Sequence, residues 1–253
     1  MADALNLLND SENIMPHLNC RFASGLMLLV VILGSYCANA DNTVDKVRAD
    51  VVSGQAIYNE GRSNAPSCKD CHGENGLGDD ATGSPRLANI GQTYFLKQLA
   101  EFAENQRTAL GAGATMGDIS RALNEQDRRD LAAYMDSLEY VEASSNLKLL
   151  ASDGNKVGNP RRGKVIATKG IKSLVPPCQN CHGFGGRSKN VPAIHQQRYS
   201  YLVNQLNSYR DGGRSNDPIV YKTGIMQGIA KKLTDENIAD VAAFLSTASG
   251  TSP

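Results

Sequence analysis

The stretch Cys-Lys-Asp-Cys-His at residues 68–72 occurs a second time, as Cys-Gln-Asn-Cys-His at residues 178–182. Cys-x-x-Cys-His is the pattern at which c-type haem is covalently attached. On one helical turn, the two-residue gap places both sulfurs at the same edge of the porphyrin, and the adjacent histidine then lies beneath the iron as its axial ligand. Two copies therefore predict two covalently attached haem c groups. The predicted attachment residues are Cys68, Cys71, His72, Cys178, Cys181 and His182.

Other cysteine chemistry fits the pattern less well. A zinc ribbon brings its two Cys-x-x-Cys pairs closer together in sequence and needs no adjacent histidine. A thioredoxin-like redox pair occurs once, between a strand and a helix. Covalent haem attachment accounts for both copies and for both histidines.

The first forty residues are predicted to be a signal peptide, residues 1–40. Arg21 precedes the apolar run 25–33, and Ala-Asn-Ala at 38–40 is a small-x-small cleavage site. The run is too short to span a bilayer comfortably, which favours export to the periplasm over a retained anchor. The stretch before it is acidic, unlike a signal peptide's first region, and translation starting at Met15 would remove that stretch.

The rest of the chain is an internal repeat. Cys68 and Cys178 are 110 residues apart, and so are Met116 and Met226. Between each motif and its methionine, one short insertion or deletion changes the spacing of matched residues to 107, and a second returns it to 110. We therefore predict two tandem domains, residues 41–145 and 161–253, joined by a linker at 146–160.

Within each copy the pattern is helical. Residues 93–105 carry apolar side chains at spacings of three and four, as in an amphipathic helix. The last helix of each copy is predicted at 125–139, with Asn124 as its N-cap, and at 235–247, with Thr234 as its N-cap. Strand signals are weak throughout, so the fold is predicted to be all-α.

Charge divides unevenly between the copies. Residues 41–147 hold 10 basic and 17 acidic residues, a net charge of −7. Residues 148–253 hold 15 basic and 6 acidic residues, a net charge of +9. Opposite poles would orient the protein before contact with charged redox partners. The basic half lacks the interleaved aromatics of a nucleic-acid surface, so no nucleic-acid partner is expected.

Three methionines follow residue 40, and they are the candidates for the sixth ligand of each iron. Met116 and Met226 are repeat partners, each expected in a glycine-rich loop before the final helix, and we predict that they complete the two iron sites. Met135 lies inside a final helix and is expected to fill the core. His195 has no histidine partner in the first copy and is expected to be a surface or core residue. The predicted iron ligands are His72, Met116, His182 and Met226.

The second nitrogen of each axial histidine also needs a partner. A ligating histidine usually donates its other N–H to a carbonyl, which fixes the ring and strengthens the ligand. The carbonyls of Pro85 and Pro192, which follow the motifs at similar spacings, are candidate acceptors. The alternative is that each proline only shapes a turn.

These residues resemble the class I cytochromes c: an early Cys-x-x-Cys-His, then Pro-x-Leu/Ile, a late methionine and a final helix carrying an aromatic. The tandem arrangement resembles the bacterial dihaem cytochrome c4 family, most closely over 225–233 and 237–244. The resemblance implies a periplasmic electron carrier that can associate peripherally with the membrane and passes electrons from a respiratory donor to a terminal oxidase or similar acceptor. It also implies that the first and last helices of each domain cross. The predicted contacts are Gly54 and Tyr58 with Tyr134, and Gly163 and Ala167 with Phe244.

Paired methionines favour electron transfer over catalysis, because they leave the iron no open position for a substrate. We therefore expect an electron-transfer protein rather than an enzyme. Two alternatives remain open. One is the haem-bearing subunit of a periplasmic dehydrogenase complex. The other is a dihaem redox enzyme, such as a peroxidase or a thiosulfate-oxidising cytochrome, which needs an open or differently ligated iron.

Overall fold

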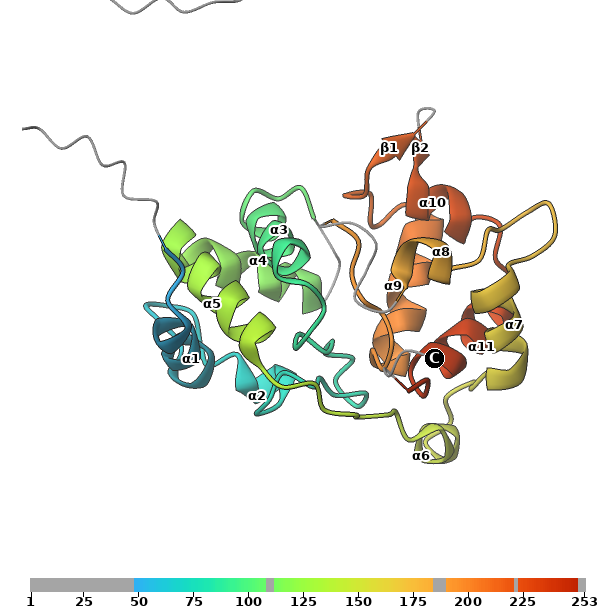
Figure 1. The fold of residues 1–253 in the computed structure, drawn as a ribbon, viewed down its shortest axis with the longest axis horizontal. Coiled ribbons are helices and arrows are strands. Elements are labelled where there is room, and N and C mark those ends of the chain that lie inside the picture. The colour runs from blue at the N-terminus through green and yellow to red at the C-terminus, as the bar shows by residue number, and fades with distance from the viewer. Residues whose placement is uncertain (1–47, 108–111, 184–189, 221–222, 250–253) are drawn as a thin grey trace, which may run out of the picture. The chain divides into compact units, whose positions relative to one another are not determined.

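The computed structural model describes most of the chain (Figure 1). The described residues, all within one compact unit, are 48–107, 112–183, 190–220 and 223–249. The predicted signal peptide and the alternative start at Met15 lie outside the described residues.

Helices dominate both halves of the chain, and the all-α prediction is confirmed. The first half contains α1 (Val51–Glu60), α2 (Lys69–His72), α3 (Gln92–Ala103), α4 (Ala112–Ala122) and α5 (Glu125–Ser137). A short helix, α6 (Leu147–Ser152), lies in the segment predicted as a linker. The second half contains α7 (Pro160–Lys169), α8 (Gln179–His182), α9 (Tyr199–Asp211), α10 (Ile225–Ala230) and α11 (Asp235–Leu245). Two two-residue strands, β1 (Ile219–Val220) and β2 (Thr223–Gly224), pair antiparallel just before α10.

The final helix of each half begins where the sequence predicts. Asn124 caps α5 and Thr234 caps α11. Each cap belongs to a reciprocal capping box, because a side-chain oxygen of the third helical residue, Asp127 or Asn237, accepts from the backbone N–H of the cap. Such boxes satisfy backbone donors that the first helical turn leaves unpaired.

The first helix of each half packs tightly on the last, as predicted (Figure 1). A Cβ atom added to Gly54 of α1 would lie 2.1 Å from the carbonyl oxygen of Asp130 in α5. A Cβ added to Gly163 of α7 would lie 1.9 Å from the carbonyl oxygen of Asp240 in α11. Only glycine allows the two backbones to approach this closely. The crossing positions the segment that carries each Cys-x-x-Cys-His motif, since that segment follows directly from the first helix.

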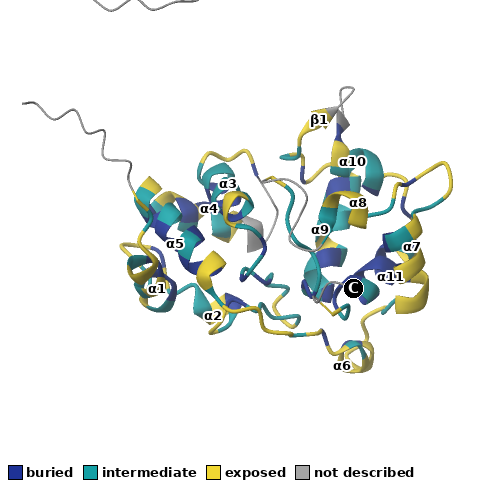
Figure 2. Cartoon of the chain, viewed as in Figure 1, coloured by how far each residue is buried: buried dark blue, intermediate teal, exposed yellow. Residues whose placement is uncertain are grey.

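Each half has its own apolar core. Buried positions follow α5 and α11, whereas α6 is mostly exposed (Figure 2). The first core includes Tyr58 and Tyr134, whose rings lie 5.7 Å apart at 54°, so the predicted contact between them is confirmed. Met135 is 1% exposed within this core, which confirms its predicted packing role. In the second core, Ala167 and Phe244 belong to one cluster.

The prediction that Met116 and Met226 lie in loops is wrong. Met116 lies inside α4, and Met226 lies in the first turn of α10. The many glycines near these residues suggested irregular backbone. Apolar residues at positions 116, 119 and 123, and again at 226, 229 and 233, have the spacing of a helix face, and this periodicity prevailed.

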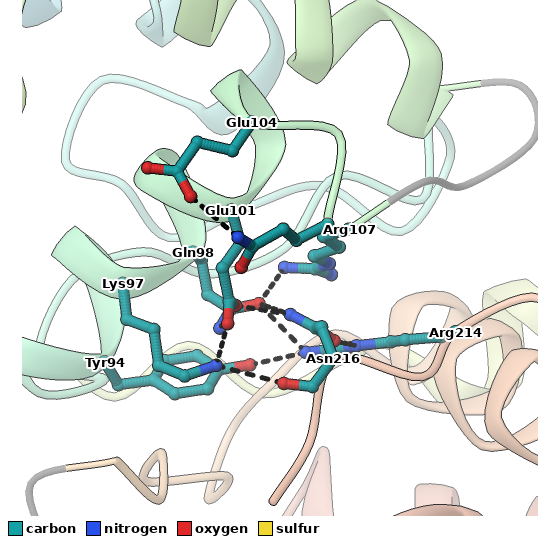
Figure 3. A network of polar contacts seen from close by, with 9 residues as sticks. Tyr94, Lys97, Gln98, Glu101, Glu104, Arg107, Arg214 and Asn216 are labelled. Atoms are coloured by element: carbon teal, nitrogen blue, oxygen red, sulfur yellow. Dashed lines mark hydrogen bonds and ion pairs between the residues drawn. The ribbon is translucent and has the colours of Figure 1, made fainter.

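Two arginines, one from each half, lie buried between the halves and share a pair of glutamines. Figure 3 shows both arginines bonded to one of them, Gln98. Arg107 donates to Oε1 of Gln98 in its own half (2.7 Å) and to Oε1 of Gln205 in the other (3.0 Å). Arg214 reciprocates, donating to Oε1 of Gln205 (2.6 Å) and to Oε1 of Gln98 (3.1 Å). The two arginines are repeat partners, and so are the two glutamines.

Each arginine also reaches a tyrosine of the opposite half. Arg107 donates to the hydroxyl of Tyr201 (3.0 Å), and Arg214 donates to the hydroxyl of Tyr94 (2.9 Å). Burial opposes ionisation of Tyr201, but the two nearby guanidinium groups prevail and lower its pKa below the ordinary value. The six side chains form a set that we call the interdomain clasp: Tyr94, Gln98, Arg107, Tyr201, Gln205 and Arg214.

Replacing Gly54 by valine tests the helix crossing. The new side chain meets a backbone carbonyl that cannot move aside, so we expect domain 1 to lose about 3 kcal/mol of unfolding free energy, the upper part of the range for overpacked cores. The measurement is denaturant unfolding of the haem-loaded protein. Gln55→Ala, an exposed change in the same helix, is the control and should leave the midpoint nearly unchanged. A Gly54→Val protein as stable as the parent would contradict the crossing.

Candidate haem-binding sites

The first Cys-x-x-Cys-His motif forms one helical turn. Cys68 precedes α2 and its carbonyl accepts from the backbone N–H of His72 (3.0 Å), while Gly73 ends the turn with φ 76°. Cys68 is half-buried and Cys71 is exposed, and neither forms a disulfide. The turn therefore presents both thiols and the histidine from a single short segment.

The second motif repeats this geometry. The carbonyl of Cys178 accepts from the backbone N–H of His182 (2.9 Å) in α8. Cys178 is half-buried and Cys181 is exposed, again without a disulfide. Burial raises the pKa of the Cys68 and Cys178 thiols to about 11, so both stay protonated at neutral pH until they react.

Both motif histidines donate from Nδ1 to a proline carbonyl. The distance is 3.0 Å from His72 to Pro85 and 2.9 Å from His182 to Pro192. The sequence left open whether these prolines accept from the histidines or only shape turns, and the structure shows that they accept. A carbonyl can only accept, so Nδ1 carries the proton and Nε2 keeps its lone pair for a metal. Burial lowers the pKa of both histidines, which favours the neutral form that ligates iron.

A tyrosine supports the first site but not the second. The hydroxyl of Tyr58, which is fully buried, donates to the carbonyl of Gly73 (2.5 Å), directly after the motif histidine. Burial raises the pKa of this phenol, so it remains a donor across the physiological range. Its repeat partner is Ala167, which cannot make this bond.

The two predicted methionine ligands, Met116 and Met226, are held in place by different contacts. Met116 is half-buried and packs against the core of domain 1, as does Cys68. Met226 is half-buried, and its backbone N–H donates to Oδ2 of Asp217 (2.5 Å). The residue before α10 is Gly224, which has no side chain to cap the helix, so Asp217 does so from outside. Sequence reasoning missed Asp217, because a cap nine residues away leaves no local signal.

His195 is half-buried near the second site. Burial lowers its pKa, and the neighbouring imidazole of His182 lowers it further. Its side chain therefore belongs to the surroundings of the second motif, although its position has no histidine counterpart in domain 1.

The donor set of each site fits haem c. Two thiols on one turn suit two thioether bonds, and a neutral imidazole with Nδ1 already bonded suits axial ligation through Nε2. Half-buried apolar side chains also pack on the same core as the half-buried cysteine. They include Leu87 and Ile119 in domain 1, and Ile194 and Val203 in domain 2.

Comparison with known proteins identifies the family. The family described as Cytochrome c matches this chain twice, over residues 51–139 and 161–249. The chain belongs to the cytochrome c family. Its two tandem domains each carry one of the sites described above.

Individual relatives share the tandem arrangement. Cytochrome c4 of Pseudomonas aeruginosa is 32% identical over 189 residues, which cover 73% of this chain and 85% of the relative. A protein named thiosulfate dehydrogenase electron acceptor, from Stutzerimonas stutzeri, is 30% identical over 203 residues, covering 78% of this chain and 87% of the relative. The crystal structure of reduced recombinant cytochrome c4 from Pseudomonas stutzeri matches with a TM-score of 0.61 at 26% identity, covering 79% of this chain and 98% of that one.

The chain is therefore a dihaem electron-transfer protein of the cytochrome c4 type, with two covalently attached haem c groups, and not an enzyme. It interacts with redox partner proteins. Within the part of the chain that the structure describes, every helix is too short or too polar to cross a membrane.

Replacing Tyr58 by phenylalanine tests the support of the first site. The change leaves the carbonyl of Gly73 without its buried donor, and we expect domain 1 to lose about 1 kcal/mol of unfolding free energy. Denaturant unfolding followed at the absorbance of each haem measures the effect. Domain 2 serves as the internal control, since it has alanine at this position. A change in the domain 2 transition equal to that of domain 1 would contradict a local role.

Proposed function

We propose that this chain is a periplasmic carrier that takes electrons one at a time from a dehydrogenase outside the cytoplasm and passes them to a terminal oxidase or another respiratory acceptor. The signal-like residues 1–40 support export. All four cysteines after residue 40 belong to the two haem-attachment motifs, which also supports export, because bacterial c-type haem is attached outside the cytoplasmic membrane. The matched setting of the two histidines carries the proposal. Each imidazole gives Nδ1 to a proline carbonyl and leaves Nε2 for a metal.

We assign the ligands residue by residue. The first iron takes His72 and Met116, and the second takes His182 and Met226. The thioether bonds are made by Cys68, Cys71, Cys178 and Cys181. Preservation of both methionines at one spacing of the repeat supports this assignment, since a methionine that only fills the core, such as Met135, is not preserved.

When bound, each haem supplies a one-electron couple between ferrous and ferric iron. The chain sets how that couple behaves. The proline carbonyls hold the imidazole rings and their tautomers, and the methionine sulfurs would bind the iron of each haem and favour its ferrous state. The apolar cores would keep water away from each bound haem. None of these groups moves a proton or bonds a substrate, which suits a carrier.

Methionine ligation is tested optically. Met116→Leu and Met226→Leu should each remove about half of the weak iron–methionine charge-transfer band of the oxidised protein, because each variant retains one His/Met site. Met135→Leu is the matched control, because that side chain is buried in the core, and it should leave the band intact. A full band in Met116→Leu would show that this residue is not the ligand of the first iron.

The donor is tested with thiosulfate dehydrogenase. The name of the relative from Stutzerimonas stutzeri, and of another from Thiomonas intermedia, supports a dehydrogenase of this kind as the electron source. We expect a purified thiosulfate dehydrogenase supplied with thiosulfate to reduce both haems. Because the two halves carry net charges of −7 and +9, raising the salt should slow the reaction by about tenfold or more.

Each component alone, the enzyme without thiosulfate or thiosulfate without the enzyme, is the control for that reaction. Failure of the complete mixture to reduce the protein would exclude this donor. Stable co-purification of the chain with a catalytic subunit would instead favour a haem-bearing subunit of a dehydrogenase complex over a diffusing carrier.

A further inference from the structure

The peptide group between Pro85 and Arg86 is hydrogen-bonded at both ends. Its carbonyl accepts from Nδ1 of His72 (3.0 Å), and its N–H donates to Oε1 of Gln197 (2.7 Å). Gln197 belongs to the second domain and lies 111 residues further along the chain than Arg86. Two hydrogen bonds through one peptide therefore connect an amide of domain 2 to the axial histidine of domain 1.

The same arrangement runs in the opposite direction. The carbonyl of Pro192 accepts from Nδ1 of His182 (2.9 Å), and the next N–H, of Ala193, donates to the carbonyl of Ile90 in domain 1 (3.2 Å). Ile90 and Gln197 are 107 residues apart, as are the two prolines, so they occupy the same position of the repeat. The acceptor peptide of each histidine is thus bonded to an oxygen of the other domain. The oxygen that bonds the Pro85–Arg86 peptide belongs to the side chain of Gln197. The oxygen that bonds the Pro192–Ala193 peptide belongs to the backbone of Ile90.

Gln197 is held firmly in this position. It is 5% exposed, and its Oε1 also accepts from the backbone N–H of Arg198 (2.9 Å). Its Nε2 donates to the carbonyl of Arg86 (2.9 Å), so both ends of the amide are bonded. Arg86 is 2% exposed, and its guanidinium donates to the carbonyls of Ala88 (3.0 Å) and Val141 (2.9 Å). The peptide and the amide therefore cannot rotate away from each other without breaking several buried hydrogen bonds.

Such a chain of hydrogen bonds has an electronic consequence. An acceptor at the N–H end of a peptide polarises it and makes its carbonyl a better acceptor. A stronger bond to Nδ1 gives the imidazole more negative charge, which makes it a more basic ligand and stabilises ferric iron. The shorter contact in domain 1, 2.7 Å against 3.2 Å, makes this effect stronger on His72 than on His182.

We propose that Gln197 is a positioning residue that acts across the domain interface, through the Pro85–Arg86 peptide, on the axial histidine of the first haem. Docking of domain 2 lowers the reduction potential of that haem relative to the second. This inference rests on the proposed ligation of iron by His72, and it adds a residue that touches neither the haem-attachment motif nor the methionine.

Replacement of Gln197 by leucine tests the proposal in the full-length dihaem protein. The variant keeps the side-chain volume but removes the acceptor, so the first haem should become easier to reduce. We expect a change of about threefold in its reduction equilibrium, or ~28 mV, since tenfold is ~59 mV for one electron. In the ferrous protein, NMR should show the Nδ1 proton of His72 moving upfield and the amide of Arg86 exchanging faster, with His182 unchanged.

Gln205→Leu is the matched control, because Gln205 belongs to the interdomain clasp and contacts neither proline peptide. It should leave the His72 proton and the difference between the two potentials unaltered. If both variants shift these quantities equally, Gln197 acts only by docking the domains, and the proposal fails.

Gln197→Glu keeps an oxygen that can accept from Arg86, so its first haem should have a potential equal to or below that of the parent. A rise like that of the leucine variant would contradict the proposal. This second variant also gives an answer if the leucine variant does not fold.

The optical spectrum separates this proposal from the proposed function. Two intact His/Met haems with an unshifted His72 proton in Gln197→Leu would overturn the cross-domain effect alone. Loss of His/Met ligation in the parent protein would overturn the ligand assignment itself.

Discussion

The hydrogen bond from each motif histidine to a proline carbonyl is the interaction on which both sites depend. The Cys-x-x-Cys turn delivers the imidazole on a short helix, but a turn of four residues does not by itself fix the rotation of a side chain. The carbonyl holds Nδ1 and so leaves Nε2 as the nitrogen that could bind a metal. The glycine crossings serve the same end, since they bring each first helix against the last and position the motif that follows.

The two domains repeat one design with a few consequential differences. Domain 1 supports its motif with Tyr58, whereas domain 2 has Ala167 at that position. After the motif proline, domain 1 has the buried Arg86 and domain 2 has Ala193. The net charges are opposite as well. These differences give two sites of the same chemistry unequal surroundings.

The interface between the halves is polar and nearly symmetric. The interdomain clasp uses repeat partners on both sides, so each arginine bonds a tyrosine of the opposite half and glutamines of both. Buried polar groups are stable when their hydrogen bonds are made, and these side chains supply most of one another's partners, although Nε of Arg107 has none among the described residues. Docking is therefore specific, and it places Gln197 against the peptide that holds His72.

The sequence by itself determined the number of haem groups, the tandem repeat and the capped final helices, and it offered the proline carbonyls only as candidate acceptors. These features are encoded by neighbouring residues or by spacings that the chain repeats. Only the tertiary structure decided that the methionines lie on helices, that Asp217 caps α10, and that Gln197 reaches a peptide of the other domain. Each of these depends on a single polar side chain, or on a helical period obscured by glycines. A glutamine that bonds a backbone 111 residues away looks, in sequence, like any solvated glutamine, because its partner is defined only when the two domains fold together.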